Sequence, residues 1–386
     1  MAAAAAMFAA CSETEVLNVA QESAPKAIAF ETYAGSATRV DPTAENSGEN
    51  FVDALEAHHT NFLVWGYKNT AATTKVFDGV EVSHDGAAWS YTIDGVTNGV
   101  YWDKSASKYE FYAAAPAPAP APAPVTPGFW ILNAKTDDQA DDYFTTTEFT
   151  VTAHNATNAL AASPTKSFKN VANATDLMIA NKEPNTAITG SVQLDFMHIL
   201  SRLNITVKET VPGTSVVKLV SLTVNGLGAT ASFDEDKVAD PSAGTYGRWG
   251  SEVSSIWTAG VTTGSVTYTA LENQTVDATA KYVLEALVMP QAADHEVVLP
   301  SAASGSKPYI AIKYTIGDGD ADDEAFTATY NLAAAFGVTS GNKLAFNEGW
   351  QNTLNIIIGA DVISFSGQVA KWKDNSDEDH NVGGTI

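Results

Sequence analysis

The feature that most constrains the fold is an alternation of apolar and polar residues that recurs in short stretches of the chain. In SVQLDFMHILSRLNITVKE (191–209), the apolar residues Val192, Leu194 and Phe196 occupy every second position. After a break, the same alternation resumes at Leu203. A period of two places alternate side chains on one face of a β-strand, whereas an amphipathic helix needs a period of 3.6. The stretch therefore predicts two consecutive strands.

Comparable runs recur along the chain, and clusters of Gly, Asp and Asn separate them. The runs are KAIAFETYAG (26–35), NFLVWGYK (61–68), AWSYTI (88–93), YEFYAAAP (109–116), VVKLVSLTVNGLG (216–228), KYVLEALVMPQ (281–291), PYIAIKYTIGDGD (308–320), EAFTATYNLA (324–333) and NTLNIIIGADVISFSGQVAKW (352–372). The last run predicts a hairpin with Gly359 at its turn. Only ENFVDALEAHHTNF (49–62) has the spacing of a short helix. Short strands with this punctuation predict an all-β protein.

The strand pattern and the length of 386 residues are enough for two β-sandwiches. At least six predicted strands lie beyond residue 190, so we expect an N-terminal sandwich over 26–190 and a C-terminal one over 191–386. The stretch APAPAPAPAPVTP (115–127) holds six of the fifteen prolines and favours an extended polyproline conformation. It is either a linker between domains or a loop insertion. The insertion is favoured because too few strands precede it to close a sandwich.

The acidic composition limits the partners that the chain can have. Asp and Glu number 45 against 21 Lys and Arg, which gives a formal net charge of -24. A phosphate backbone would be repelled, so no nucleic-acid partner is expected. No run of 18 or more apolar residues occurs, so the sequence predicts no membrane-spanning helix.

Cys11, the single cysteine, ends the short apolar run AAAAAMFAA. This arrangement resembles a bacterial lipoprotein signal peptide, in which the cysteine becomes the lipidated first residue. Residues 1–10 would then be the remainder of the signal peptide, and residues 11–25 a polar tether. The acidic SETE after the cysteine resembles the tether of surface lipoproteins. The alternative is an Ala-rich leader with an incidental thiol.

Signals for enzymatic chemistry are weak. No thiol beyond Cys11 and no G-x-S-x-G motif is present, and His198 beside a strand predicts a structural histidine. GDGDADDEAF (317–326) begins like a calcium loop, but Asp323 stands where a glycine is needed, so an acidic hairpin loop is favoured. We therefore expect no catalytic residues, no cofactor and no metal. An enzyme would require the aspartates of 317–324 to bind a metal in a cleft.

Arginine is rare, and its distribution points to one exposed loop. Only Arg39, Arg202 and Arg248 occur, and Arg39 is alone in the first 200 residues. Its surroundings, AGSATRVDPTAENSG, are rich in Gly, Ser, Thr and Asn and follow the first predicted strand. Such a loop tip is open to proteolysis.

Several segments together resemble the Bacteroidetes fimbrillin family, the subunits of type V pili. VQLDFMHILSRLNITVK is similar to the V-x-L-x-F-x-H-x-L-S-R-L segment of that family. The segments YEFYAAAP, DLMIAN, ALVMPQ and GWQNTLNIIIGADVISFSGQVAKW follow the order found in the family. The resemblance implies two tandem transthyretin-like β-sandwiches, mostly antiparallel, with at most one or two short helices.

The resemblance also implies a pathway of export, maturation and assembly at the cell surface. The chain would be exported as a lipoprotein anchored in the outer membrane through Cys11. An Arg-specific protease would cut between Arg39 and Val40 and remove the strand KAIAFETY. A donor strand from another pilus subunit, drawn from its residues 361–386, would fill the open groove, giving a fimbria.

The runner-up interpretation is a monomeric surface lipoprotein in the outer membrane. It would keep its lipid at Cys11, would not be cut at Arg39, and would bind a glycan or a host protein through the loops of its sandwiches.

Overall fold

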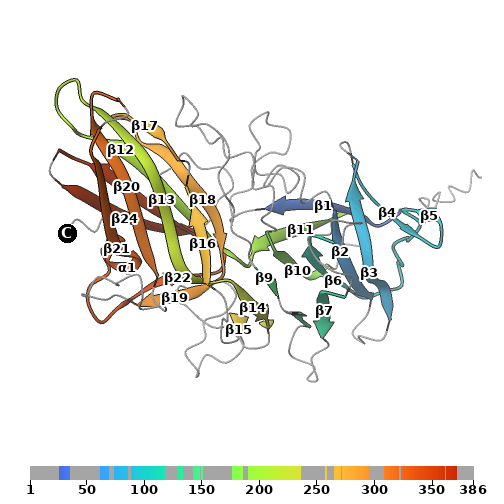
Figure 1. Cartoon of the computed structure of the whole chain (residues 1–386). Helices are drawn as coiled ribbons and strands as arrows, with labels where there is room; N and C mark the ends of the chain where they lie inside the picture. Colours follow the sequence, from blue (N-terminus) through green and yellow to red (C-terminus); the bar gives the residue numbers. More distant parts are fainter. Residues whose placement is uncertain are drawn as a thin grey trace, which may run out of the picture.

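The computed structural model is built almost entirely of strands (Figure 1). It describes residues 26–34, 61–68, 74–85, 88–117, 128–133, 142–147, 149–150, 176–185, 190–235, 257–258, 265–270, 272–294, 308–320, 323–360 and 362–371. Within these ranges the one α-helix is α1 (Leu332–Ala335). The helix predicted over 49–62 lies outside the described residues up to position 60, and its last two residues begin a strand.

The N-terminal part forms an eight-stranded sheet in the order β1-β11-β10-β6-β2-β3-β4-β5. Its strands are β1 (Ala29–Ala34), β2 (Asn61–Lys68), β3 (Lys75–His84), β4 (Trp89–Ile93), β5 (Val96–Thr97), β6 (Tyr109–Ala115), β10 (Met178–Asn185) and β11 (Ser191–His198). Strand β1 pairs with β11 in parallel, and the other neighbours pair in antiparallel.

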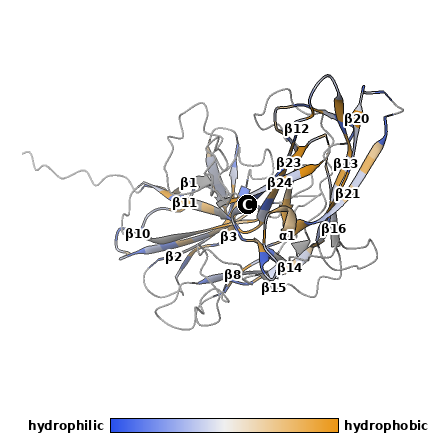
Figure 2. Ribbon diagram, turned by 90° about the vertical axis from the view of Figure 1, so that its left-hand side faces the viewer, coloured by the Kyte–Doolittle hydropathy of each residue, from blue (hydrophilic) through white to orange (hydrophobic). Residues whose placement is uncertain are grey.

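The C-terminal part contains a four-stranded sheet, β18-β12-β23-β24, and a five-stranded sheet, β16-β13-β20-β21 with β17 also paired to β13. The strands are β12 (Ser201–Glu209), β13 (Val216–Gly228), β16 (Ser265–Thr269), β17 (Gln274–Val276), β18 (Lys281–Val288), β20 (Tyr309–Gly317), β21 (Ala325–Asn331), β23 (Trp350–Ile358) and β24 (Ile363–Lys371). Figure 2 shows apolar colour along β12, β13, β20 and β23, whose buried side chains fill the core between the two sheets.

Three small sheets complete the described fold: β7–β8, β9–β14–β15 and β19–β22. The strands are β7 (Trp130–Asn133), β8 (Tyr143–Thr146), β9 (Phe149–Thr150), β14 (Thr230–Phe233), β15 (Trp257–Thr258), β19 (Gln291–Asp294) and β22 (Lys343–Phe346). The pairing of β9 with β14 joins a segment before residue 190 to one after residue 200, so the two parts are connected by backbone pairing as well as by the chain.

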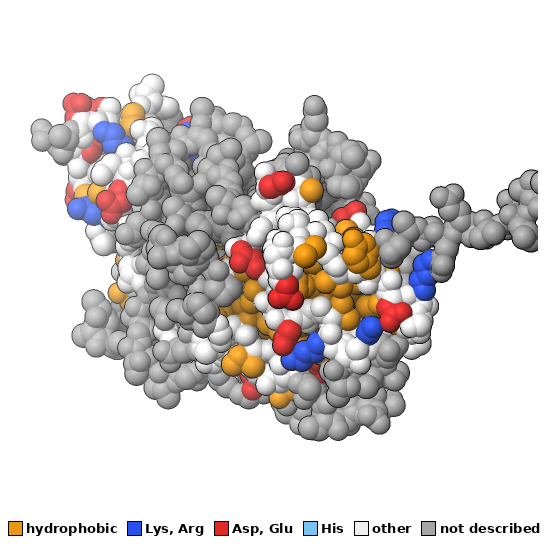
Figure 3. Space-filling model, turned by 90° about the vertical axis from the view of Figure 1, so that its right-hand side faces the viewer, with side chains coloured by type: hydrophobic (Ala, Val, Ile, Leu, Met, Phe, Trp, Pro, Cys, Tyr) orange, Lys and Arg blue, Asp and Glu red, His pale blue; other side chains and the backbone are white. Residues whose placement is uncertain are grey.

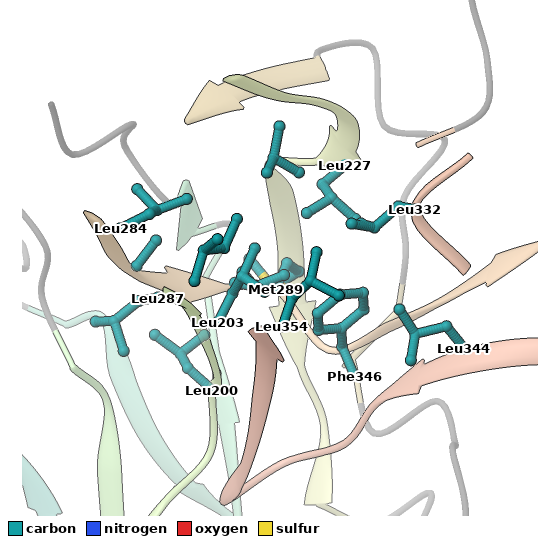
Figure 4. Close-up of a cluster of buried hydrophobic side chains, with 14 of the residues drawn as sticks. Leu200, Leu203, Leu227, Leu284, Leu287, Met289, Leu332, Leu344, Phe346 and Leu354 are labelled. Atoms are coloured by element: carbon teal, nitrogen blue, oxygen red, sulfur yellow. The ribbon is translucent and has the colours of Figure 1, made fainter. Parts of the chain in front are cut away.

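The apolar core runs without interruption from the N-terminal sheet into the C-terminal sandwich. Trp65 of β2 and Ile179 of β10 belong to the same buried cluster as Leu203 and Leu287. Figure 4 shows the C-terminal end of this cluster, where Leu203, Leu287, Phe346 and other labelled side chains converge from several strands. A second cluster fills the other face of the eight-stranded sheet. The central strands of this sheet are therefore covered on both faces.

The two parts meet at a two-residue break between β11 and β12. His198, which is 5% exposed, ends β11, and its Nδ1 lies 2.5 Å from Oδ2 of the buried Asp176. Ile199 N–H donates to the carbonyl of Leu177, and Gly349 N–H donates to the carbonyl of Leu200. His198 is thus a structural residue, as predicted, and the break is fixed by backbone and side-chain hydrogen bonds.

The all-β, mostly antiparallel fold predicted from the sequence is confirmed, including both strands of 191–209 and the hairpin at Gly359. The division into two tandem sandwiches stays a proposal. Because β11 pairs within the N-terminal sheet, we propose that the division lies after His198 rather than between residues 190 and 191. Of the Ala-Pro stretch, Ala115 is the last residue of β6, Pro116 and Ala117 follow it, and residues 118–127 lie outside the described residues.

Gly367 of β24 packs directly against the end of α1, and this contact predicts a destabilising substitution. A Cβ added to Gly367 would lie 2.7 Å from the carbonyl oxygen and 2.8 Å from the Cα of Phe336. Because these are backbone atoms, Gly367→Ala is expected to lower the free energy of unfolding by about 1–3 kcal/mol in a urea titration. The exposed neighbour Ser366 provides the control, since Ser366→Ala should change it by less than about 0.5 kcal/mol.

Glu348, in the turn between β22 and β23, predicts a pH dependence. Its Oε1 is buried and makes no hydrogen bond in the structure, and burial raises the pKa of the carboxyl group to about 8. In the unfolded chain the carboxyl ionises near its ordinary pKa of 4.5. The contribution of Glu348 to the free energy of unfolding is therefore highest below that pH and falls as the pH rises toward 8. Glu348→Gln should flatten this fall in urea titrations at pH 5 and pH 8. An unchanged slope would contradict the assignment.

Candidate strand-exchange groove

The segment 26–34, which includes β1, is held by two segments that are distant from each other in the sequence. One edge pairs in parallel with β11 over six positions, from Ala29 opposite Ser191 to Ala34 opposite Phe196. On the other side, Ala27 forms an antiparallel bridge with Tyr101. In Figure 1, β1 is the dark blue strand beside β11. Residues 29–34 therefore pair with β11 and the residues just before them pair with the segment around Tyr101, so that the whole segment occupies a groove.

Three hydrogen bonds hold the start of this segment. Ile28 N–H donates to the carbonyl of Val100 at 2.8 Å, and Trp102 N–H donates to the carbonyl of Lys26 at 3.1 Å. The hydroxyl of Tyr91 donates to the carbonyl of Ile28 at 3.0 Å. Burial raises the pKa of Tyr91, which keeps this hydroxyl protonated. The groove thus satisfies the backbone of its occupant as well as its side chains.

The occupant inserts alternate side chains. Ile28 is 0% exposed and Phe30 is 4% exposed, whereas Glu31 is exposed to solvent. This is the burial expected of a strand with one face against a core, and it follows from the alternation in the sequence. Both buried side chains belong to the cluster that covers the outer face of β2, β6 and β10, away from the C-terminal sandwich.

The ring of Phe30 is surrounded by four other aromatic rings, which we call the aromatic cage. Its centroid lies 6.4 Å from Phe62, 5.3 Å from Phe77, 5.9 Å from Tyr91 and 5.8 Å from Phe111. All four pairs have edge-to-face geometry, which is favourable for aromatic rings beyond the area they bury. The cage is the most specific feature of the groove.

The segment that closes the groove opposite β11 is itself anchored. The indole of Trp102 donates to the carbonyl of Gly190 at 3.2 Å, which joins this segment to the start of β11. Next to it, Lys68 Nζ lies 2.8 Å from the carboxylate of Asp103. Hydrogen bonds from Lys68 and Ser105 hold the pKa of Asp103 well below its usual value, so the carboxylate stays charged. None of these three contacts involves a residue of β1.

The predicted site residues Cys11, Arg39 and Val40 lie outside the described residues, so lipid attachment and cleavage stay predictions. The described part of β1 ends at Ala34, five positions before Arg39 in the sequence. The segment KAIAFETY (26–33) was predicted to be the strand that is removed, and β1 (Ala29–Ala34) overlaps this segment.

In the acidic loop, both carboxylate oxygens of Asp323 accept backbone hydrogen bonds, at 3.3 Å from the nitrogen of Asp318 and 3.0 Å from that of Gly319. The carboxylate therefore stabilises the turn. Among the described residues, no group of three or more His, Cys, Asp or Glu is placed to hold a metal ion. No helix among them is long and apolar enough to cross a membrane.

The aromatic cage was not predicted from the sequence. Its members Phe62, Phe77, Tyr91 and Phe111 come from four strands, β2, β3, β4 and β6. Three of these strands were predicted, but no local pattern shows that their inward side chains meet. Figure 3, which looks at this end of the molecule, shows apolar side chains gathered at the surface as well.

Substitutions in β1 and in β4 should separate the contribution of the cage from that of the strand as a whole. Phe30→Ala is expected to lower the free energy of unfolding by about 3–5 kcal/mol, since the cage cannot collapse onto a small side chain. Tyr91→Phe removes the hydrogen bonds that the hydroxyl makes with Ile28 and Val100 and should lower it by about 1–2 kcal/mol. Glu31→Ala is the matched control within the same strand and should have little effect. Urea titrations measure all three values, and equal losses for Phe30 and Glu31 would contradict the assignment.

The chain is similar to solved structures of fimbrial proteins, one of which, with a TM-score above 0.5, supports the fold. A fimbrial protein from Bacteroides vulgatus aligns with a TM-score of 0.51 at 14% identity, over 90% of this chain and 99% of that chain. The C-terminally truncated tip fimbrial protein Mfa3 from Porphyromonas gingivalis aligns with a TM-score of 0.36 at 10% identity, over 83% of this chain and 96% of that chain. No curated protein sequence matches the chain.

A family model described as fimbrillin-like matches residues 38–372, which is most of the sequence. The match includes β2, β6 and β11, which contribute to the groove, and the β23–β24 hairpin at the C-terminal end. The chain therefore belongs to the fimbrillin-like family.

Proposed function

We propose that this chain is a structural, non-enzymatic subunit of a cell-surface fimbria, and that it assembles by exchange of the strand β1. The observation that carries this proposal is the way β1 is held. Phe30 fills an aromatic cage, residues 29–34 pair with β11, and residues 26–28 are hydrogen-bonded to 100–102. The chain reaches Arg39 five residues beyond the last described position of β1. Membership of the fimbrillin-like family supports the same function and a location at the cell surface.

Removal of β1 would expose apolar side chains and unpaired backbone groups to water, which would destabilise a monomer. The sites of Ile28 and Phe30 would open, and each buried side chain of this size contributes about 1.5–3 kcal/mol. The backbone groups of β11 that face β1 would also lose their partners. A strand from another subunit can restore both the apolar contacts and the backbone pairing by β-augmentation. Repetition of this contact from head to tail produces a polymer.

The steps before assembly follow from the N-terminal sequence. Cys11 would carry the lipid that anchors the subunit in the outer membrane, with residues 11–25 as the tether. An Arg-specific protease would cut between Arg39 and Val40, which releases both the anchor and β1. The partners are other pilus subunits, whose donor strand would come from residues 361–386 or an equivalent segment.

Determination of the N-terminus of the protein recovered from cell-surface material tests the proposal. We expect a mature chain that begins at Val40, together with a ladder of polymers on denaturing gels without heating. Arg39→Lys is the matched variant, because it keeps the charge but removes the site of an Arg-specific protease. This variant should retain its N-terminal segment and lose the ladder.

Recovery of the wild-type chain only with acylated Cys11, and with no shorter form, would overturn the maturation step. The chain would then be a monomeric anchored lipoprotein, and binding of a glycan or a host protein would become the leading function.

A further inference from the structure

We propose that the aromatic cage selects the incoming strand by requiring a phenylalanine two positions after an aliphatic residue. In this chain the pair that meets the requirement is Ile363 and Phe365 of a second copy. The proposal rests on the proposed function, because it concerns the occupant of the groove after β1 has left.

The first argument is the size of the space that Phe30 fills. Four rings face it edge-on, at interplanar angles of 90°, 72°, 66° and 81°. Rings placed in this way are held by their own strands, so the space does not shrink around a smaller group. An alanine or serine at this position would leave a cavity, whereas a phenylalanine restores every contact. The cage therefore discriminates by size and by aromatic character.

The second argument is Gly66, which opens the cage. A Cβ added to Gly66 would lie 2.9 Å from Cδ2 of Phe77 and 3.0 Å from Cδ1 of Phe111. Any larger residue at this position of β2 would push these two rings toward the space that Phe30 occupies. Gly66 is therefore a specificity-determining residue, although the effect of its substitution would reach the occupant through Phe77 and Phe111.

The third argument concerns the backbone of the occupant. The position of Ile28 needs an N–H group for the carbonyl of Val100 and a carbonyl for the hydroxyl of Tyr91. A proline cannot supply the N–H group, so it is excluded at this position. The Ala-Pro stretch of 115–127 is therefore a poor occupant, since it alternates proline and has no aromatic residue.

The fourth argument is the match between β1 and β24. Ile28-Ala29-Phe30-Glu31 corresponds to Ile363-Ser364-Phe365-Ser366, with a small residue between the apolar pair and a polar one after it. Within 361–386 this is the one place where Ile, Leu or Val stands two positions before an aromatic residue. The order of the pair fits the groove when the incoming strand runs parallel to β11, as β1 does.

The side chains of β24 already have the right disposition. Ile363 is 8% exposed, the ring of Phe365 lies 4.5 Å from that of Tyr330, and Ser364 and Ser366 are exposed. Donation requires β24 to leave β23, with which it forms nine residue pairs. The donor therefore gives up buried, paired contacts in its own C-terminal part, and β24 gains the contacts of the groove in the acceptor.

The experiment uses the full chain after cleavage at Arg39 by an Arg-specific protease. Arg248→Lys removes a second site, and Arg202 lies within β12, which is paired on both sides. The N-terminal fragment stays in the groove through the contacts of β1. Labelled peptides of residues 26–34 and 361–369 are then added, and the release of the fragment is followed by native mass spectrometry and fluorescence anisotropy.

We expect both peptides to displace the fragment. Phe30→Ala in the first peptide and Phe365→Ala in the second should weaken displacement by at least about 100-fold, as expected for an empty cage. Ser364→Ala is the matched control and should have little effect, because Ser364 faces outward. Gly66→Ala in the protein should weaken both parent peptides together. The peptide variants leave the protein unchanged, so the test does not depend on the folding of the Gly66 variant.

Three results would overturn the proposal at different points. Equal binding of the Phe365→Ala peptide and its parent would show that the cage does not select for a phenylalanine. Displacement by the 26–34 peptide but not by the 361–369 peptide would remove β24 as the donor while strand exchange stands. Failure of every peptide, including 26–34, would show that the groove does not exchange its strand, and the proposed function would fall with the further inference.

Discussion

Burial of both faces of the central strands of the N-terminal sheet is the constraint on which the rest of the structure depends. In β6, Tyr109 and Phe111 face the cluster that contains β1, whereas Tyr112 faces the core shared with the C-terminal sandwich. One face therefore needs an occupant for its groove, and the other face joins the two halves of the molecule. Strands buried on both faces have nearly continuous apolar sequences, as YEFYAAA of β6 does.

The sequence was informative wherever the structure depends on local alternation. The strands at 61–68 and 216–228, the break inside 191–209 and the turn at Gly359 follow from period-two patterns and turn residues. It was uninformative wherever strands distant along the chain meet, because the same pattern is compatible with many partners. The parallel pairing of β1 with β11 and the convergence of four rings on Phe30 are results of this kind. The need for a glycine at position 66 arises in the same way, because Phe77 and Phe111, which crowd it, come from two other strands.

Polar groups at the junction have a different function from those of the surface. The pair of His198 and Asp176 is buried at the end of β11, and Ser201 donates to the carbonyl of Trp350 at 3.1 Å at the start of β12. Such groups require defined partners in a low-dielectric environment, so they favour one arrangement of the two sheets over others that would bury the same apolar area. Together with the continuous core, they make the junction a fixed connection.

The parallel pairing of β1 with β11 has a mechanical consequence. Its hydrogen bonds lie across the strand direction, so a force along the strand stretches the bonds of all six paired positions at once, in shear. A force across the strands would open the same bonds one after another, at much lower tension. Any strand that takes the place of β1 would inherit this resistance, and the hydrogen-bonded junction would pass the tension from the N-terminal sheet to the C-terminal sheets.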